Sequence, residues 1–461
     1  MHQQDKRLRY AQLRAELPYF IFESFDIKVT NIGLEVVYHF NLAGRYHFYP
    51  SFTLPKRDFY NLGKDIDIRE DVRLQNLVFH IGMVELVSYW KAACPVQVII
   101  KPFKLAPEQI AWWKKVYFHG LGEFFYLNSI ESEIHSFMQI ECTPAKPTRQ
   151  FDIDLDNKLI IPVGGGKDSV VTLELLSQQF DTIALIMNPR GASLQTAEVA
   201  GFTSDHIIEI NRTIDPLLLE LNKQDFLNGH TPFSALLAFH CLLASAITGR
   251  RHIALSNESS ANEATVKNMQ INHQYSKSIA FEADFRWYVA RYISPAFNYF
   301  SFLRPLNELQ IARLFVRFPA YFDVFKSCNV GSKIDIWCGH CPKCLFAFII
   351  LSPFISRGRI VEIFGKDMFA DELLWPYLLQ LTGLDDIKPF ECVGTVDEVN
   401  LAMEIILAGR GKEELPVLLK RYAESISSTH YQTGLSNTLL NEFNEDHFLQ
   451  NDFLSILKKA I

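Results

Sequence analysis

The sequence has no long apolar run. Its longest one, residues 345–351, resumes after a serine and runs through Pro353 to Ile355, whereas a membrane-spanning helix needs about 20 apolar residues. The first seven residues show no basic segment followed by an apolar one, which is the pattern that opens a secretory signal. We therefore expect a cytoplasmic protein without a membrane partner.

A strong basic charge is also missing. The chain of 461 residues carries a formal net charge of −7 and therefore offers no general positive field for a phosphate backbone. This argues against a nucleic acid partner, although it does not exclude a local basic groove. The length suits two or three domains, and the composition, 48% hydrophobic and 21% charged, is typical of a globular fold. We find no internal repeat and no low-complexity segment.

Two familiar phosphate-binding motifs are absent as well. Neither Gly-x-x-x-x-Gly-Lys-Ser/Thr nor Gly-x-Gly-x-x-Gly fits the glycine-rich segment. The chain has instead an apolar run at 159–163, a polar glycine-rich loop, and an apolar stretch at 170–176 that suits a helix. The loop consists of Gly164, Gly165, Gly166, Lys167, Asp168 and Ser169. Its glycines permit positive φ, and the unpaired amides at the start of the helix attract phosphate.

The loop resembles the PP-loop of the ATP pyrophosphatases, Ser-Gly-Gly-x-Asp-Ser. Four positions match, at Gly165, Gly166, Asp168 and Ser169. Lys167 fills the variable position, and Gly164 replaces the first serine, which removes one hydroxyl from the phosphate contacts. The resemblance implies that ATP binds here with magnesium, and that a substrate oxygen attacks the α-phosphorus to give an adenylate and pyrophosphate. The alternative is a glycine-rich turn without a ligand.

The predicted elements divide the chain into three parts. Residues 1–150 are expected to form an α+β N-terminal domain that binds the substrate, and the prolines at 144 and 147 indicate a linker after it. Residues 151–355 alternate strands with helices, which predicts an α/β fold with a doubly wound parallel sheet. Residues 356–461 are expected to be mainly helical. They end in a predicted amphipathic helix at 439–461 that packs on the body.

Polar residues follow several of the predicted strands. We expect strands at 159–163, 182–187, 206–210 and 252–255, and a long helix at 232–248. In such sheets the ligands lie beyond the carboxyl ends of the strands. Asn188 follows the second strand, and Asn257 follows the fourth within the polar segment 256–263. We expect both asparagines to contact the nucleotide.

Six side chains are candidates for proton transfer. They follow the fourth strand, precede the long helix, or lie between 273 and 277, and they are Glu258, Glu263, His230, His273, Tyr275 and Lys277. The carboxylates could instead bind ribose or magnesium, and a loop that only caps a helix would look similar. Arg286 offers a further clamp for a carboxylate or phosphate. The residues alone do not choose among the six.

Half of the eight cysteines lie close together. They are Cys328, Cys338, Cys341 and Cys344. In a cytosolic chain such spacing indicates a metal site before disulfides, and four thiolates close a tetrahedral shell around a structural zinc ion. An iron–sulfur cluster fits the same number of thiols, and His340 could replace one of them. We expect zinc.

Two enzyme families combine these features. A PP-loop followed by four cysteines is similar to 7-cyano-7-deazaguanine synthase, which is a much shorter chain. Over most of its length the sequence more closely resembles the UDP-N-acetylmuramoyl-L-alanyl-L-glutamate epimerases of bacterial peptidoglycan synthesis. This resemblance rests on residues 80–91, 164–169, 256–263, 273–277, 338–344 and 389–394.

The epimerase resemblance implies that ATP and magnesium support inversion of the terminal L-glutamate of UDP-MurNAc-L-Ala-L-Glu. A carboxylate holds its α-proton tightly, whereas an acyl adenylate is neutral at the carbonyl and releases it more readily. Proton return on the other face and hydrolysis would give the D-glutamyl product, AMP and pyrophosphate. Two alternatives stay open, namely a ligase that traps the adenylate with ammonia and a sensing module that binds ATP without turnover.

Overall fold

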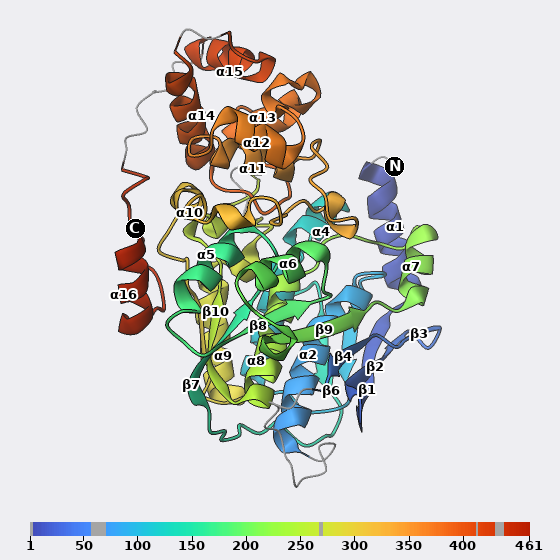
Figure 1. Ribbon diagram of the computed structural model, residues 1–461. Coiled ribbons are helices and arrows are strands. Elements are labelled where there is room, and N and C mark those ends of the chain that lie inside the picture. Colours follow the sequence, from blue (N-terminus) through green and yellow to red (C-terminus); the bar gives the residue numbers. More distant parts are fainter. Residues whose placement is uncertain (1–2, 57–70, 267–270, 412–413, 429–437) are drawn as a thin grey trace.

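The computed structural model describes residues 3–56, 71–266, 271–411, 414–428 and 438–461 (Figure 1). Its strands form one eleven-stranded sheet in the order β11-β10-β7-β8-β9-β4-β2-β1-β5-β6, with β3 paired to β2. Most neighbouring strands are parallel. This confirms the mixed α/β class with a mostly parallel sheet. No helix in these ranges is long and apolar enough to cross a membrane.

The parallel half of the sheet carries the glycine-rich loop. It consists of β7 (Asp156–Pro162), β8 (Thr182–Met187), β9 (Ile207–Thr213), β10 (Arg250–Leu255) and β11 (Asn298–Ser301). The four predicted strands are all present, and β11 is an addition. Successive side chains of a strand point to opposite faces, so Ile160 packs in one core while Leu159 and Ile161 pack in the other. Such strands are buried on both faces, which explains their continuous apolar sequences.

Helices cover both faces of this half (Figure 1). The core that contains Ile160 also takes side chains from α2 (Val72–Trp90), α3 (Pro107–Gly120), α4 (Gly122–Leu127), α7 (Pro216–Lys223), α8 (Phe233–Thr248) and α9 (Ile279–Tyr292). The core that contains Leu159 takes side chains from α5 (Lys167–Leu176), α6 (Gly191–Val199), α10 (Glu308–Phe315) and α11 (Pro342–Leu351). The long helix predicted at 232–248 is therefore confirmed as α8.

The N-terminal strands extend the same sheet. They are β1 (Tyr19–Thr30), β2 (Gly33–Leu42), β3 (Tyr46–Phe48), β4 (Ser51–Pro55), β5 (Gln97–Ile100) and β6 (Gln139–Cys142), and α1 (Gln3–Glu16) precedes them. The link is an antiparallel pairing of β4 with β9. Beside it, Arg212 of β9 makes a bidentate ion pair with Glu85 of α2, with both N–O distances 2.7 Å. The domain boundary expected near residue 150 stays a prediction.

The C-terminal part is helical. It contains α12 (Arg357–Phe364), α13 (Trp375–Thr382), α14 (Val396–Arg410), α15 (Val417–Ser428) and α16 (Asn451–Ala460), and α12 to α15 lie together at one end of the molecule (Figure 1). The helix predicted at 439–461 was wrong except for α16. Between Thr438 and Gln450 the short polar side chains bond to nearby backbone, as when Asn444 Oδ1 accepts from the Asp446 amide at 2.9 Å, and such contacts compete with helix. Phe453 of α16 packs on Phe180 of the body.

Candidate active site

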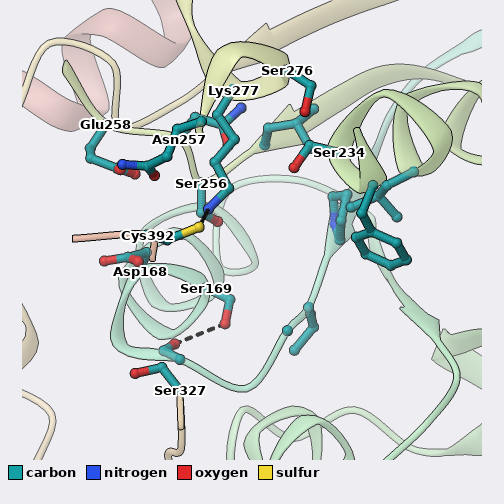
Figure 2. Close-up of a pocket in the computed structure, with 18 of the residues that line it drawn as sticks. Asp168, Ser169, Ser234, Ser256, Asn257, Glu258, Ser276, Lys277, Ser327 and Cys392 are labelled. Carbon is teal, nitrogen blue, oxygen red and sulfur yellow. Dashed lines mark hydrogen bonds between the residues drawn. The ribbon is translucent and has the colours of Figure 1, made fainter. Parts of the chain in front are cut away.

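The glycine-rich loop joins β7 to α5 at the carboxyl end of the parallel strands. Gly165 has a φ of +85°, and a Cβ there would lie 2.7 Å from the carbonyl carbon of Ala192 and 2.8 Å from the nitrogen of Ser193. Only glycine fits this backbone without strain. Gly166 immediately precedes α5, and Ser169 Oγ donates to its carbonyl at 2.9 Å (Figure 2). The loop therefore turns sharply and places the first amides of α5 at the end of the sheet.

A cavity of about 520 Å³ lies beyond the ends of β7, β8 and β10. Ligand sites commonly measure about 300 to 1,000 Å³, and in α/β sheets they occupy this edge. The sequence-predicted residues that line the cavity are Gly164, Gly166, Asp168, Ser169, His230, Asn257, Glu258, His273 and Lys277. Three segments that lie far apart in the sequence thus meet around one space (Figure 2).

Three predicted nucleotide contacts, Gly165, Lys167 and Asn188, are not among the lining residues. Lys167 is buried, where its ammonium forms ion pairs with Asp168 and Glu308. Asn188 has a φ of +50° at the end of β8, and its Oδ1 accepts a hydrogen bond from the Arg212 amide at 2.7 Å. Lys167 therefore holds two carboxylates beside the cavity, and Asn188 supports the backbone of β9. Gly165 does not line the cavity either, because it lies against Ala192.

Two predicted proton-transfer groups also lie away from the cavity lining. Glu263 forms an ion pair with Lys388 and lines a separate pocket. Tyr275 is buried with its ring 5.0 Å from that of His119. Arg286, the expected clamp, donates to the carbonyl of Tyr299 and does not line the cavity either.

Three carboxylates converge beside the loop. Asp168 comes from α5, Glu258 follows β10, and Glu308 begins α10, and the three offer oxygens within 4.8 Å of one another. Burial raises the pKa of Glu308 to about 7 against the opposing charge of Lys167, and burial also raises the pKa of Glu258. Carboxylate oxygens are the ligands that magnesium prefers. The residues present therefore fit this ion.

A second polar group lines the cavity around His273. Glu123 of α4 has Oε2 2.5 Å from His273 Nδ1 and 3.6 Å from His230 Nδ1. Burial would lower the pKa of His273, but its hydrogen bonds with Cys392 and Glu123 raise it to about 9. Burial, together with the charge of His273, lowers the pKa of His230 to about 4. A cationic imidazole therefore lies beside a neutral one, with ring centroids 4.4 Å apart.

The side chain of Cys392 belongs to this second group. Lys277 Nζ lies 3.3 Å from Cys392 Sγ, and the two side chains face each other in the cavity (Figure 2). Burial would lower the pKa of Lys277, but the negative charges of Cys392 and Glu258 raise it. Lys277 is therefore a cation that contacts a sulfur atom.

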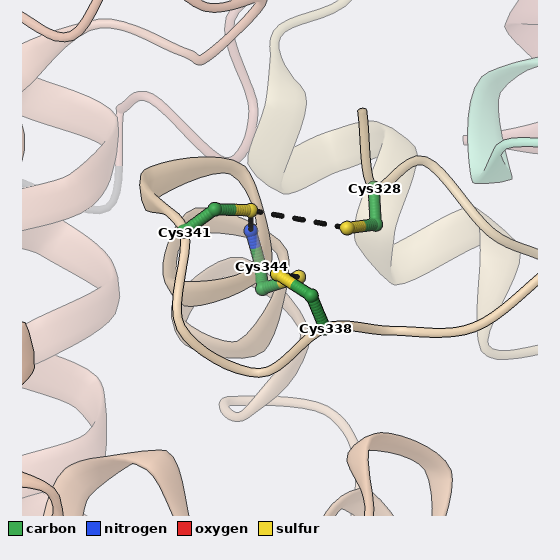
Figure 3. Close-up of side chains that lie close together, drawn as sticks. All are labelled: Cys328, Cys338, Cys341 and Cys344. Carbon is green, nitrogen blue, oxygen red and sulfur yellow. Dashed lines mark hydrogen bonds between the residues drawn. The ribbon is translucent and has the colours of Figure 1, made fainter. Parts of the chain in front are cut away.

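The four cysteines converge as predicted. The sulfurs of Cys328 and Cys341 are 3.9 Å apart, those of Cys338 and Cys344 are 3.7 Å apart, and all four lie within 4.8 Å (Figure 3). A tetrahedral zinc ion with Zn–S bonds of about 2.3 Å requires sulfurs about 3.8 Å apart. The Gly331 amide also donates to Cys328 Sγ at 3.1 Å, which stabilises a thiolate. The four cysteines could therefore hold a metal ion, and the geometry is consistent with zinc.

Fold and site together define an α/β protein with a glycine-rich loop at the end of a parallel strand and a four-cysteine cluster. Two family models match the sequence, the MurL N-terminal domain over residues 11–302 and the MurL C-terminal domain over residues 324–435. The chain belongs to the MurL family. The predicted family is therefore confirmed.

Three relatives share the name UDP-N-acetyl-alpha-D-muramoyl-L-alanyl-L-glutamate epimerase. The protein from Salinispora tropica is 34% identical over 77% of this chain and 78% of its own. The one from a Micromonospora species is 33% identical over 80% and 82%, and the one from Xanthomonas oryzae pv. oryzae is 35% identical over 75% and 77%. No solved structure matches the chain significantly.

The sequence analysis missed several residues at the site. Cys392 and Lys343 line the cavity, while Glu308 joins the carboxylates and Glu123 contacts His273. Cys392 lies in the segment 389–394 that carries the family resemblance, so the sequence could have indicated it as a site residue. Glu123, Glu308 and Lys343 stand in ordinary helical sequence, and only the fold brings them to the site.

Proposed function

We propose that this protein is an ATP-dependent epimerase that converts the terminal L-glutamate of UDP-MurNAc-L-Ala-L-Glu to D-glutamate in peptidoglycan precursor synthesis. One observation carries the proposal. In a chain of the MurL family, a glycine-rich loop, the carboxylates of Asp168 and Glu258, and side chains that could transfer protons line a single cavity. The relatives' name suggests the substrate, and the cavity suggests the chemistry.

The loop would hold the phosphates of ATP. Gly164, Gly166 and Ser169 line the cavity beside the positive end of α5, where backbone amides and the helix dipole favour anions. Asp168, Glu258 and Glu308 would hold magnesium, which supplies neutralisation of phosphate charge. Lys167 holds two of these carboxylates together by pairing with Asp168 and Glu308.

Adenylation of the glutamyl α-carboxylate would prepare the α-carbon for proton exchange. The carbonyl of the acyl adenylate carries no negative charge, so the α-proton leaves more readily than from the free carboxylate. Of the six predicted proton-transfer groups, Glu258, His230, His273 and Lys277 line the cavity. Glu263 and Tyr275 lie outside the lining, so this proposal gives them no direct role.

The four-cysteine cluster would hold a structural zinc ion. Cys328, Cys341 and Cys344 are at most 5% exposed, and four thiolates leave no coordination position open for a substrate. The ion would fix the segment 328–344, which contributes Asn329 and Lys343 to the cavity lining. Its role is to shape the site.

The test is to incubate the protein with ATP, magnesium and the nucleotide dipeptide in heavy water. We expect pyrophosphate and AMP, a D-glutamyl product, and deuterium at its α-position, because a solvent proton replaces the original one. Without ATP there should be no label, since side chains of ordinary pKa cannot deprotonate the α-carbon of a carboxylate. Pyrophosphate release without label or inversion would refute the epimerase, and its dependence on ammonia would then identify a ligase.

A matched pair of carboxylates tests the location of the site. Glu258 and Glu263 lie in one segment, but only Glu258 lines the cavity. Glu258→Gln should reduce pyrophosphate release at least about 100-fold, the scale of a lost catalytic contact. Glu263→Gln should retain it. Equal effects of the two substitutions would contradict the proposed position of the site.

A further inference from the structure

Cys392 differs from every other cysteine of the chain in its surroundings. Four cysteines belong to the metal cluster, while Cys94 and Cys241 are buried in the core and Cys142 ends β6. Cys392 is half-buried and is the one cysteine among the lining residues that the structure describes for the cavity. Its sulfur is therefore placed where a substrate could reach it.

A cation contacts the sulfur directly. Lys277 Nζ donates to Cys392 Sγ at 3.3 Å, and His273, which lines the same cavity, interacts with the thiol closely enough for that interaction to raise the pKa of the imidazole. His273 is itself fixed by Glu123, whose Oε2 lies 2.5 Å from Nδ1. Because an ammonium can only donate, the sulfur is the acceptor in the hydrogen bond with Lys277.

The electrostatics agree with this geometry. Burial alone would raise the pKa of the Cys392 thiol, but the charge of Lys277 and the hydrogen bond with His273 bring it well below its ordinary value. Thiols beside lysine or protonated histidine are commonly thiolates at neutral pH. The pKa values of His273 and Lys277 are raised by the same contacts, so neither has a free lone pair for proton abstraction. Among Cys392, His273 and Lys277, the unprotonated base is the sulfur. The neutral imidazole of His230 lies beside His273 as a separate base.

We propose that Cys392 is one of the two groups that exchange the α-proton of the glutamyl residue, an inference that rests on the epimerase function proposed above. The thiolate takes the α-proton and becomes a thiol, and the C–H electron pair passes into the adenylate carbonyl as an enolate. A proton derived from water returns to the α-carbon on the opposite face. The thiol then loses its proton to solvent, which restores the thiolate. Lys277 and His273 act as positioning residues for the sulfur.

The experiment separates proton exchange from adenylation. In heavy water with ATP and the nucleotide dipeptide, Cys392→Ser should continue to release pyrophosphate but form D-product at least about 100-fold more slowly, the usual loss when a general base is removed. Deuterium in the recovered L-isomer would show that the base that removes the α-proton is intact and that Cys392 returns the proton on the opposite face. Absence of deuterium there would show that Cys392 removes the α-proton of the L-isomer. Cys142→Ser, a half-buried cysteine outside the cavity, should behave like the wild type.

Chemical blocking of the wild-type protein covers the case in which Cys392→Ser does not fold. Methyl methanethiosulfonate should modify Cys392 faster than Cys142, as mapped by mass spectrometry. It should stop inversion while pyrophosphate release continues, and dithiothreitol should restore inversion. Lys277→Met should slow the modification, because fewer Cys392 side chains are thiolates. Inversion at the wild-type rate in Cys392→Ser, or loss of pyrophosphate release together with inversion, overturns the proposal. A wild type that releases no pyrophosphate refutes the proposed function instead.

Discussion

Replacement of Gly165 by alanine should damage the loop, whereas the same change at its neighbour Gly164 should not. At Gly165 a Cβ would meet backbone atoms of α6 at 2.7 and 2.8 Å, and the φ of +85° is unfavourable for an L side chain. At Gly164 no heavy atom lies within 4 Å of the added Cβ, and its φ is outside the positive region. The two adjacent glycines therefore form a matched pair.

The magnitude follows from two contributions. Left-handed backbone costs a non-glycine residue about 1 to 2 kcal/mol, and an added methyl group against fixed atoms costs about 1 to 3 kcal/mol. Gly165→Ala should therefore destabilise the protein by about 2 to 5 kcal/mol, less than the whole stability of a typical fold. Any relaxation that relieves the overlap must move the loop away from α6. Gly164→Ala should change stability by no more than about 0.5 kcal/mol.

Urea unfolding followed by tryptophan fluorescence measures the loss of stability, and pyrophosphate release measures the damage to the loop. Gly165→Ala should unfold at lower urea and release far less pyrophosphate. Gly164→Ala should unfold at the same urea concentration as the wild type, and so should Gly164→Ser, which restores the serine of the PP-loop pattern. If Gly165→Ala and Gly164→Ala have the same midpoint and the same activity, the loop does not depend on its left-handed glycine.

Three further outcomes are expected. Elemental analysis should find one zinc per chain, lost in Cys344→Ala and retained in Cys142→Ala; iron in place of zinc would contradict the assignment. Glu85→Gln leaves the buried guanidinium of Arg212 without its ion pair and should lower the unfolding free energy by about 3 to 5 kcal/mol in urea titrations. Burial lowers the pKa of His240 from 6.5 to about 4. Between these two pH values the unfolded chain therefore binds a proton at this histidine, and the folded protein does not. The contribution of His240 to stability should therefore be full above about pH 6.5 and be lost, by about 3 kcal/mol, toward pH 4. His240→Leu should flatten that loss, and an unchanged pH profile would count against it.

Local patterns predicted much of the parallel half of the sheet. Buried parallel strands read as short apolar runs, so β7, β8, β9 and β10 were all predicted within a few residues of their observed bounds. The loop was also predictable, because three glycines between an apolar strand and a helix are typical of a sharp turn. β11 was missed because its four residues, Asn298–Ser301, form too short a segment for any period to show.

The C-terminal helix shows where local pattern fails. Residues 439–449 contain apolar side chains at helical spacing, yet the structure has α16 only from Asn451. Asn307 Nδ2 donates to the Leu439 carbonyl, and Gln310 Nε2 donates to the Glu442 carbonyl, both at 2.6 Å. These distant side chains bond to backbone carbonyls that a helix would otherwise use. The sequence of residues 439–461 alone could not predict these contacts.

At the site, the sequence predicted segments better than individual side chains. Glu258 and Glu263 stand five residues apart in one polar segment, but the 3₁₀ turn at Ser259–Asn262 separates them, and only Glu258 lines the cavity. His273 and Lys277 were both predicted as proton-transfer groups, yet their contacts with Cys392 hold both of them protonated. Which group carries the proton depends on a partner more than 100 residues away in the sequence, so the pattern could not show it.

Under the proposed function, the same contacts would also fix the order of the two chemical steps. A thiolate at Cys392 repels the free α-carboxylate of the substrate, since like charges at short range in a buried site oppose each other strongly. Adenylation removes that negative charge from the carbonyl, and the sulfur can then approach the α-carbon. ATP would therefore act twice, by raising the acidity of the α-proton and by admitting the substrate to its base. The glycine-rich loop and the Cys392 group lie in one cavity, which allows the adenylate to reach the base without leaving the protein.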